Sequence, residues 1–571
     1  MSHITPYWQR YQRLILIAFT FLMLESFGDL LQPLIVSMII DQGVMEGALP
    51  VVVRLGGLML IVTVFGAGCA ITRCIISSKV SQQFGADLRL DLYTKINHFS
   101  FTALNKQETA SLITRMTNDT SQLVGFTHAM MRVFVRSPIL LFGAITMTFV
   151  LNPRLGFILL IVVPLIALLM YISMKVGFPL FVKIQEALDR NNAVLREYLS
   201  GVRVVKAYNT FDQEVARFNI SNTELASTAV KATRVVGIFF PVISFAVNMA
   251  LVVTLWLARG WVYSGHMYVG QVVAFLNYMM QITMSLRMIF NVYQMFIRAK
   301  ASAVRVGDIL AEEDLCVVDD DFREPYKKPV SIEFDNVTFS YPGSENESVL
   351  KDVSFKLSPG ETLGIIGSTG AGKTSLVQLV PAFYYPQKGV VKIGGTPITQ
   401  IDLADLRASI AYVAQKNTLF YGTIADNIRM GKPDATQDEI TAAAIAAKAH
   451  DFITACPNGY DTIVGQKGVN FSGGQKQRIG IARALVRNAQ ILILDDCVSA
   501  VDVETESNIM RSINISSPTT LLITQRISSI MNLRNILVLE SGCVVGFGDH
   551  LSLMETCDVY KEIYHSQLVT L

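Results

Sequence analysis

Long runs of hydrophobic residues dominate the first half of the chain. Six such runs lie at roughly 14–40, 55–78, 129–150, 155–178, 236–259 and 269–298. A helix needs about 20 residues to cross the hydrocarbon core of a bilayer, so each run is long enough to span a membrane. The pattern predicts an N-terminal domain over residues 1–310 with six membrane helices.

Basic residues are distributed unevenly between the segments that connect these runs. The long connections at 79–128 and 179–235 are rich in lysine and arginine, whereas three short connections hold one arginine each, Arg54 in 41–54, Arg154 in 151–154 and Arg259 in 259–268. Loops rich in lysine and arginine stay on the cytoplasmic side of a membrane. We therefore expect a multi-pass protein of the cytoplasmic membrane, with both termini in the cytoplasm.

The hydrophobic pattern changes after residue 310. A polar linker is expected at 311–329, and short β-rich runs then alternate with helical segments over 330–571. Of the 571 residues 51% are hydrophobic and 16% are charged, which is typical of a membrane protein. The net charge of +2 is too small to indicate a nucleic-acid partner, and the seven cysteines show no metal-ligand spacing.

A glycine-rich loop follows an apolar strand in "TLGIIGSTGAGKT", residues 362–374. Such a loop turns successive N–H groups toward phosphate oxygens, so ATP is the expected ligand. Lys373 is expected to reach the β- and γ-phosphates, and Thr374 to bind Mg²⁺. The predicted phosphate loop comprises Gly367, Ser368, Thr369, Gly370, Ala371, Gly372, Lys373, Thr374 and Ser375.

Two further segments extend this site. In "ILILDD" a buried strand ends at Asp495, a carboxylate placed to hold Mg²⁺ beside a nucleotide. In "FSGGQ", Ser472, Gly473 and Gly474 precede a helix and form a second candidate anion site. Since the chain already has a phosphate loop, we expect this second site to contact ATP bound to another subunit. An ordinary glycine-capped turn is the alternative.

With these motifs the chain resembles the ATP-binding cassette (ABC) family over nearly its whole length. The order of the domains resembles exporters, so the resemblance implies an α-helical six-span transmembrane domain followed by a cytoplasmic α/β P-loop ATPase domain. It further implies that Tyr341 of "FSYPG" stacks on adenine and that Gln415 of "YVAQ" binds Mg²⁺ and γ-phosphate. It also implies a signature of Ser472, Gly473, Gly474 and Gln475, and a dimer-contact loop that ends at Asp502.

Two residues depart from the family pattern in the cleaving part of the site. The family has a glutamate that orients the attacking water where this chain has Asp496, which is shorter by roughly 1.5 Å. The family has a histidine near γ-phosphate where this chain has Gln525, and glutamine carries neither a proton nor a positive charge. The residues expected to bind ATP are retained. The pattern predicts a pocket that binds ATP well and cleaves it slowly.

An intact signature beside a slow pocket predicts a heterodimer. The resemblance is to the degenerate subunit of bacterial heterodimeric multidrug exporters, in which a second half-transporter subunit supplies the competent catalytic residues. The expected cargo is a hydrophobic or amphipathic small molecule taken from membrane lipid. A homodimeric lipid or peptide flippase and a regulatory ATP-sensing membrane protein remain as alternatives.

Ionisable and amide side chains within the apolar runs mark a candidate substrate pathway, because such groups are costly in hydrocarbon. They are Glu25, Asp29, Arg73, Gln281 and Arg287. A Glu25–Arg73 salt bridge is the structural alternative. Asp41, at the outer end of the first run, resembles an acidic gate residue of exporters, but it could also cap a helix.

Two segments of the long cytoplasmic connections are predicted as coupling helices that dock on the ATPase domains. They are "TASLITRMTNDTSQL" at 109–123 and "LSGVRVVKAYNTFDQE" at 199–214. Both are expected to be short amphipathic helices between long extensions of the membrane spans. Plain solvated helices are the alternative.

Overall fold

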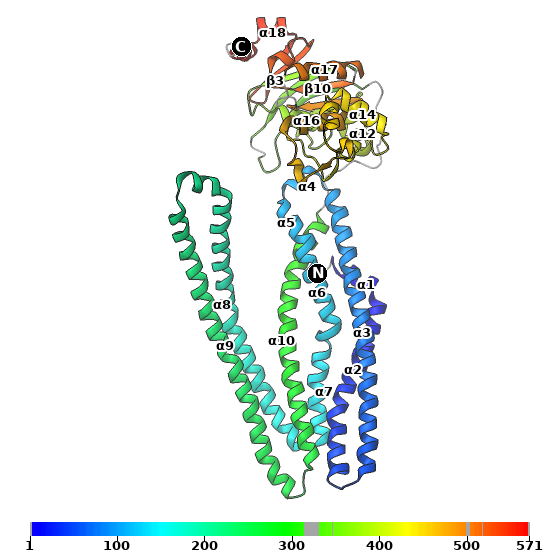
Figure 1. Cartoon of the computed structure of the whole chain (residues 1–571), viewed down its shortest axis with the longest axis vertical. Helices are drawn as coiled ribbons and strands as arrows, with labels where there is room; N and C mark the ends of the chain where they lie inside the picture. Colours follow the sequence, from blue (N-terminus) through cyan, green and yellow to red (C-terminus); the bar gives the residue numbers. More distant parts are fainter. Residues whose placement is uncertain (1–2, 313–329, 345–346, 498–502, 517, 569–571) are drawn as a thin grey trace. The chain divides into compact units, whose positions relative to one another are not determined.

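The computed structural model describes residues 3–312, 330–344, 347–497, 503–516 and 518–568. These residues form two compact units. The helical unit comprises the described residues of 1–97 and 109–312, and the sheet unit comprises those of 98–108 and 313–571 (Figure 1). Most of the linker predicted at 311–329 lies outside the described residues.

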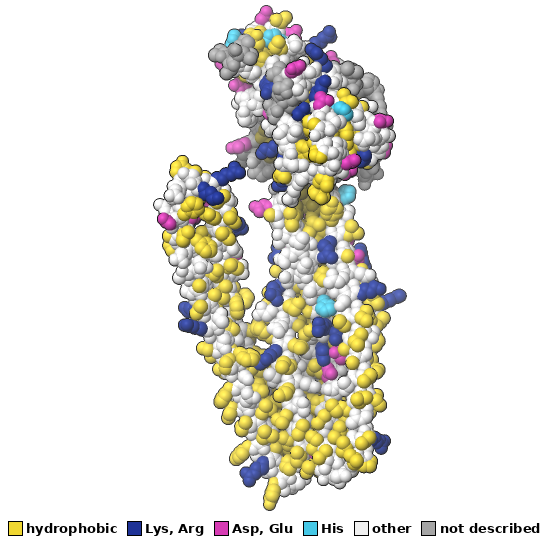
Figure 2. Space-filling model, viewed as in Figure 1, with side chains coloured by type: hydrophobic (Ala, Val, Ile, Leu, Met, Phe, Trp, Pro, Cys, Tyr) yellow, Lys and Arg dark blue, Asp and Glu magenta, His cyan; other side chains and the backbone are white. Residues whose placement is uncertain are grey.

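The helical unit contains the six predicted spans. Over the described residues, six helical runs are long and apolar enough to cross a membrane: Gln12–Val44, Leu49–Asn97, Thr109–Leu151, Pro153–Tyr208, Phe211–Tyr263 and Val269–Ala311. Each is longer than the apolar run that predicted it, because helix-forming residues continue into the polar connections. Figure 2 shows hydrophobic side chains covering the end of this unit at which the first run connects to the second, the third to the fourth and the fifth to the sixth, with few charged groups among them.

The helices of this unit follow one another with short turns. They are α1 (Thr5–Arg10), α2 (Gln12–Met38), η1 (Ile39–Val44), α3 (Leu49–Asn97), α5 (Thr109–Thr114), η2 (Arg115–Asp119), α6 (Thr120–Ala129), η3 (Met130–Phe134), α7 (Arg136–Leu151), α8 (Pro153–Tyr208), α9 (Phe211–Tyr263) and α10 (Val269–Ala311). Asn152 caps α8 by accepting a hydrogen bond from the Arg154 amide, with Pro153 at the first helical position.

The structure differs from the prediction of two short coupling helices. Residues 109–123 comprise α5, η2 and the start of α6, and they continue into the third helical run, so they do not form a short helix set apart from the span. Residues 199–214 contain the end of α8, a turn, and the start of α9. Asn209 ends α8 in the left-handed conformation, with φ 54°. Residues 199–214 therefore do not form a separate short helix. A role of these segments in coupling stays a prediction.

A short helix that precedes 109–123 belongs instead to the sheet unit. This helix, α4 (Phe101–Asn105), begins at Ser100, whose hydroxyl accepts a hydrogen bond from the Ala103 amide. The Phe101 ring lies 4.4 Å from the Phe383 ring, centroid to centroid. The Asn105 side-chain amide donates a 2.6 Å hydrogen bond to the Tyr384 hydroxyl.

The sheet unit is built on a six-stranded sheet with the order β12-β11-β3-β10-β9-β6. Its strands are β3 (Thr362–Gly367), β6 (Ile410–Val413), β9 (Ile491–Asp495), β10 (Thr519–Ile523), β11 (Asn535–Glu540) and β12 (Cys543–Gly548). All neighbours are parallel except β12, which pairs antiparallel with β11. Every residue of β9 and β10 is buried, as expected for a parallel sheet covered on both faces.

Two smaller sheets and a set of helices complete this unit. The strands are β1 (Ile332–Phe339), β2 (Leu350–Leu357), β4 (Lys388–Ile393) and β5 (Thr396–Pro397), in the order β2-β1-β4-β5, and the pair β7 (Gly422–Thr423) and β8 (Ile463–Val464). The helices are α11 (Lys373–Leu379), η4 (Ile398–Gln400), α12 (Leu403–Ala408), α13 (Ile424–Arg429), α14 (Gln437–Ala446), α15 (His450–Thr454), η5 (Gly459–Asp461), η6 (Gln466–Gly468), α16 (Gly473–Leu485), α17 (Val503–Ser516), η7 (Ile527–Ser529), α18 (His550–Thr556) and α19 (Asp558–Leu568).

Candidate nucleotide-binding site

The parallel strands bring the predicted ATP-site residues to one edge of the sheet. The carboxyl ends of β3, β10, β9 and β6 lead into Gly367, Gln525, Asp495 and Gln415, respectively. In an open α/β sheet, ligands bind outside the carboxyl ends of the strands. Sequence segments more than 100 residues apart therefore meet at one pocket because their strands are neighbours.

The loop after β3 has a backbone that favours glycine. Gly367, Gly370 and Gly372 have φ values of 155°, 85° and 96°. A Cβ atom at Gly367 would lie 2.0 Å from the Leu539 carbonyl oxygen, so the loop cannot accept a side chain there. The Lys373 ammonium lies inside the curl and donates hydrogen bonds to the carbonyls of Gly367 and Ser368, both at 2.7 Å. Burial lowers the pKa of Lys373, against the raising effect of the two nearby aspartates.

Asp495 and Thr374 form an oxygen pair suited to Mg²⁺. The Thr374 hydroxyl donates a 3.0 Å hydrogen bond to Asp495 Oδ1, and Asp495 is 1% exposed. Burial raises the pKa of the Asp495 carboxyl, while the hydrogen bonds from Thr374 and Tyr412 lower it. Carboxylate and hydroxyl oxygens are the hard ligands that Mg²⁺ prefers, so these residues fit the ion. Bound Mg²⁺ would neutralise charge on the phosphates.

Asp496 is held between two side-chain amides. Gln415 Nε2 donates to Asp496 Oδ2 at 3.1 Å, and Gln525 Nε2 donates to the same oxygen at 3.0 Å. Asp496 is buried and has a φ of 47°, a left-handed conformation that aspartate tolerates better than most residues. The two residues that depart from the family pattern are thus in direct contact.

Most of the predicted ATP-site residues line one cavity of about 210 Å³. The lining residues are Val349, Thr369, Gly370, Gly372, Lys373, Thr374, Ser375, Gln415, Asp495, Asp496 and Gln525. The arrangement combines a positive charge and backbone amides for phosphate with carboxylates for a metal. Asp502, predicted to end the dimer-contact loop, lies outside the described residues.

Two predicted elements lie apart from this cavity lining. Tyr341 directs its hydroxyl to Ser375 Oγ, 2.8 Å away, and its ring meets the Tyr384 ring edge to face at 5.2 Å. Ser472 and Gln475 form a reciprocal cap at the start of α16, with Ser472 and Gly473 exposed. The signature residues do not line the pocket of their own chain.

Tyr412 is a site residue that sequence reasoning missed. Its hydroxyl donates a 3.0 Å hydrogen bond to Asp495 Oδ2, and burial together with the Asp495 charge raises its pKa. Tyr412 lies on β6, which pairs with β9 so that Tyr412 stands opposite Ile493. The sequence places Tyr412 three residues before Gln415, which is the one indication that it lies near the site. Its contact with Asp495 follows only from the pairing of β6 with β9.

The ionisable residues in the apolar runs form an ion-pair network in the helical unit. Arg73 Nε lies 2.8 Å from Glu25 Oε2, so the predicted alternative of a Glu25–Arg73 salt bridge is present. Arg136, which sequence reasoning did not single out, joins Glu25 at 3.1 Å and Asp29 at 2.6 Å. Gln281 donates a 3.0 Å hydrogen bond to the Asp29 carbonyl. A role of these residues in a substrate pathway stays a prediction.

Asp41 and Arg287 lie apart from this network. Asp41 Oδ1 accepts a 2.6 Å hydrogen bond from the Gly270 amide at the start of α10, and Oδ2 accepts one from the Ser37 hydroxyl. Asp41 therefore caps a helix, the alternative that its sequence position left open. Arg287 lies over the Phe240 ring, 4.8 Å from its centroid.

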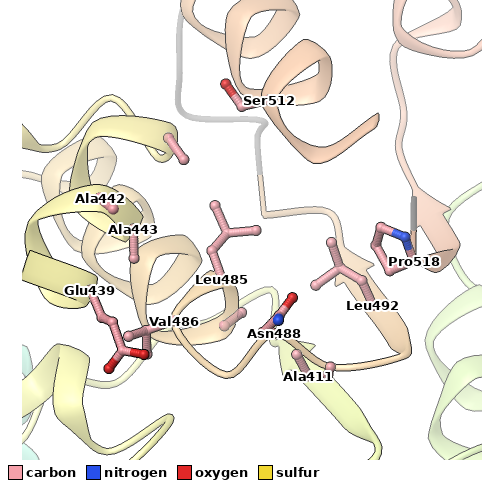
Figure 3. A pocket seen from close by; sticks show the side chains of 13 residues that line it. Ala411, Glu439, Ala442, Ala443, Leu485, Val486, Asn488, Leu492, Ser512 and Pro518 are labelled. Atoms are coloured by element: carbon pink, nitrogen blue, oxygen red, sulfur yellow. The ribbon is translucent and has the colours of Figure 1, made fainter. Parts of the chain in front are cut away.

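A further hollow in the sheet unit is separate from the nucleotide cavity. It has a volume of about 310 Å³ and is bordered largely by small apolar side chains such as Ala411, Ala442 and Ala443 (Figure 3). Its acidic member, Glu439, is already paired with Lys432. The hollow shares no lining residue with the nucleotide cavity.

The fold and the site define a membrane-spanning helical unit joined to a nucleotide-binding ATPase. Residues 15–286 match the ABC transporter transmembrane region, and residues 350–499 match the ATPase region described as "ABC transporter". The chain belongs to the ABC transporter family and has the exporter fold. It is 38% identical over 561 residues to the uncharacterized ABC transporter ATP-binding protein YfiB of Bacillus subtilis, covering 98% of this chain and 97% of that protein.

Two other relatives extend the comparison. The ATP-dependent lipid A-core flippase of Saccharophagus degradans is 33% identical over 484 residues, covering 84% of this chain and 81% of the flippase. A solved structure of a bacterial Atm1-family ABC exporter with ATP bound superimposes with a TM-score of 0.82 at 26% identity, covering 98% of this chain and 99% of the exporter.

Proposed function

We propose that this chain is one half of a heterodimeric ABC exporter and carries its slow ATP site. The observation that carries the proposal is the direct contact of Asp496 with Gln525. Neither residue supplies what the family uses for cleavage, which is a long carboxylate beside water and a histidine beside γ-phosphate. Lys373, Thr374 and Asp495, the residues predicted to bind Mg·ATP, line the same cavity, which supports retained binding.

The exposed signature supports a role for this chain in a second ATP site. Ser472 and Gly473 are exposed at the start of α16 and do not line the nucleotide pocket of their own chain. The partner subunit would supply a catalytic glutamate and histidine, and this chain would complete that pocket with its signature. Hydrolysis there resets the transporter after ATP has drawn the two ATPase domains together.

The proposed cargo is a hydrophobic or amphipathic compound taken from the cytoplasmic leaflet. The basic residues of the long connections support a cytoplasmic location for both termini. The flippase relative favours a second candidate function, movement of a lipid by the same transport cycle. A regulatory ATP sensor is the remaining alternative.

The proposal is tested by inactivating each pocket in turn. The purified complex is reconstituted in liposomes, and ATP-driven transport is measured after Asp496→Asn in this chain or after the corresponding carboxylate of the partner subunit is changed to its amide. Asp496→Asn is expected to retain most transport, whereas the partner variant is expected to lose it. Equal losses, or transport by this chain alone, would contradict the heterodimer.

A further inference from the structure

The helical unit contains a cavity between α8, α9 and α10. Its volume is about 780 Å³, and aromatic and methionine side chains such as Phe178, Phe181 and Met295 line it. A neighbouring hollow of about 270 Å³ shares Ser173, Val236, Phe290 and Asn291 with it. Arg287 borders the smaller hollow, and Arg298 borders the larger one.

The charged side chains that line these two hollows are both arginines, Arg287 and Arg298. The sequence of the surrounding helices contains no aspartate or glutamate over 153–185, 225–263 and 269–307. Among the described residues, neither Arg287 nor Arg298 has a carboxylate within ion-pair distance. Arg73, in contrast, is neutralised by Glu25. Arg287 is half-buried against the Phe240 ring, and Arg298 is exposed where it borders the larger cavity. Both arginines are therefore cations that no carboxylate of the described residues neutralises.

The level of these arginines fits the cytoplasmic side of a bilayer. At 1.5 Å per residue, Arg287 lies about 27 Å along α10 from its outer end, and Arg298 lies about 44 Å along it. The hydrocarbon core is about 30 Å thick, and the bilayer is about 40–45 Å thick with both head-group layers, so Arg287 lies at the depth of the inner leaflet and Arg298 at the level of its head groups. Apolar walls and two cations, about 17 Å apart along α10, suit a molecule with an apolar body and a negative head.

We infer that the cavity selects amphipathic anions, with the apolar body against the phenylalanines and a sulfonate, phosphate or carboxylate near Arg287 and Arg298. This inference rests on the proposed export function and names the substrate class of that function. Charge complementarity excludes cationic amphiphiles as the preferred cargo, because the cavity lining offers no carboxylate to pair with them.

The test uses inside-out membrane vesicles from cells that produce the full chain with its partner subunit. Three probes share one pyrene-labelled twelve-carbon chain and end in a sulfonate, an alcohol or a quaternary ammonium. ATP-dependent uptake of the sulfonate is expected to exceed uptake of the other two. Arg287→Gln and Arg298→Gln should each lower sulfonate uptake about tenfold and leave alcohol uptake within about twofold.

Two controls separate charge from folding. Arg287→Lys keeps the positive charge and should keep most sulfonate uptake, while Lys175→Gln removes an exposed charge of α8 that does not line the cavity and should change nothing. Equal uptake of the three probes, preference for the ammonium, or equal loss of all probes in the arginine variants would overturn the inference while export stands. Absence of ATP-dependent uptake of every probe would contradict the proposed function as well.

Discussion

The side-chain amide of Gln525 donates a hydrogen bond to the carboxylate of Asp496 at 3.0 Å. A second amide, that of Gln415, donates to the same oxygen. Asp496, which follows the aspartate predicted to bind Mg²⁺, thus accepts hydrogen bonds from two side-chain amides, and neither amide can exchange a proton with it. This contact is the basis of the proposal that the pocket binds ATP and cleaves it slowly.

Restoring both members of this pair is expected to restore cleavage. Asp496→Glu combined with Gln525→His should raise hydrolysis at this pocket by about 10²-fold or more, because each positioned group contributes about 10²–10⁴ to the rate. Either single change should give much less. The rate of ATP hydrolysis is measured in a complex whose partner pocket has lost its catalytic glutamate, so that the pocket of this chain accounts for the hydrolysis that remains.

A binding-deficient control confirms the origin of that gain. Lys373→Ala removes the ammonium inside the phosphate loop and should abolish the recovered hydrolysis. An unchanged rate in the double variant would show that Asp496 and Gln525 do not limit this pocket.

The Tyr412 hydroxyl is expected to position Asp495 for Mg²⁺. Tyr412→Phe removes one hydrogen bond to Asp495 and should weaken Mg·ATP binding several-fold, about 1 kcal/mol. ATP affinity in the absence of Mg²⁺ should change little. Titration of a fluorescent ATP analogue with and without Mg²⁺ measures both values. Tyr421→Phe, at a side chain 78% exposed, is the matched control, and equal weakening with and without Mg²⁺ would contradict the positioning role.

Loss of one member of the ion-pair network in the helical unit is expected to destabilise the fold more than loss of both members of a pair. Glu25→Gln leaves Arg73, 4% exposed, and Arg136 without a shared carboxylate and should lower the free energy of unfolding by about 3–5 kcal/mol. Adding Arg73→Gln should recover part of that loss. Thermal unfolding in detergent provides the comparison, with Glu46→Gln at an exposed position as the control. A double variant less stable than Glu25→Gln would argue against the pairing.

Close packing at Gly480 is expected to fix the signature helix against the loop after Gln415. A Cβ atom there would lie 1.5 Å from Asn417 Nδ2, whose amide donates to the Lys476 carbonyl at 2.7 Å. Gly480→Ala should therefore destabilise the sheet unit by about 1–3 kcal/mol. Gly473→Ala, in open space on the same helix, should change stability far less. Equal melting temperatures for the two variants would refute this account.

The sequence predicted the parts of this protein that depend on local pattern. Apolar runs of sufficient length predicted six spans, and the glycine spacing from Gly367 to Thr374 predicted the phosphate loop. The contacts of Arg136 with Glu25 and Asp29 could not be predicted, because helix packing decides which charges meet. The bond from Tyr412 to Asp495 likewise depends on which strands are neighbours.

The coupling segments show where local pattern misleads. Residues 109–123 have the amphipathic spacing of a short helix, but the same helical periodicity continues into the span. The segment grouped with the sheet unit is 98–108, where Phe101 and Asn105 meet Phe383 and Tyr384. A five-residue helix carries too little periodicity for sequence reasoning to find.

The subunit composition of the native complex tests the central claim most directly. The chain is tagged in its own membrane, and the purified complex is weighed by native mass spectrometry. The heterodimer account predicts one copy of this 63.1 kDa chain with a second, different subunit of similar size whose sequence has glutamate and histidine where this chain has Asp496 and Gln525. Two copies of this chain would contradict it, since Asp496 and Gln525 would then have to cleave ATP without a partner.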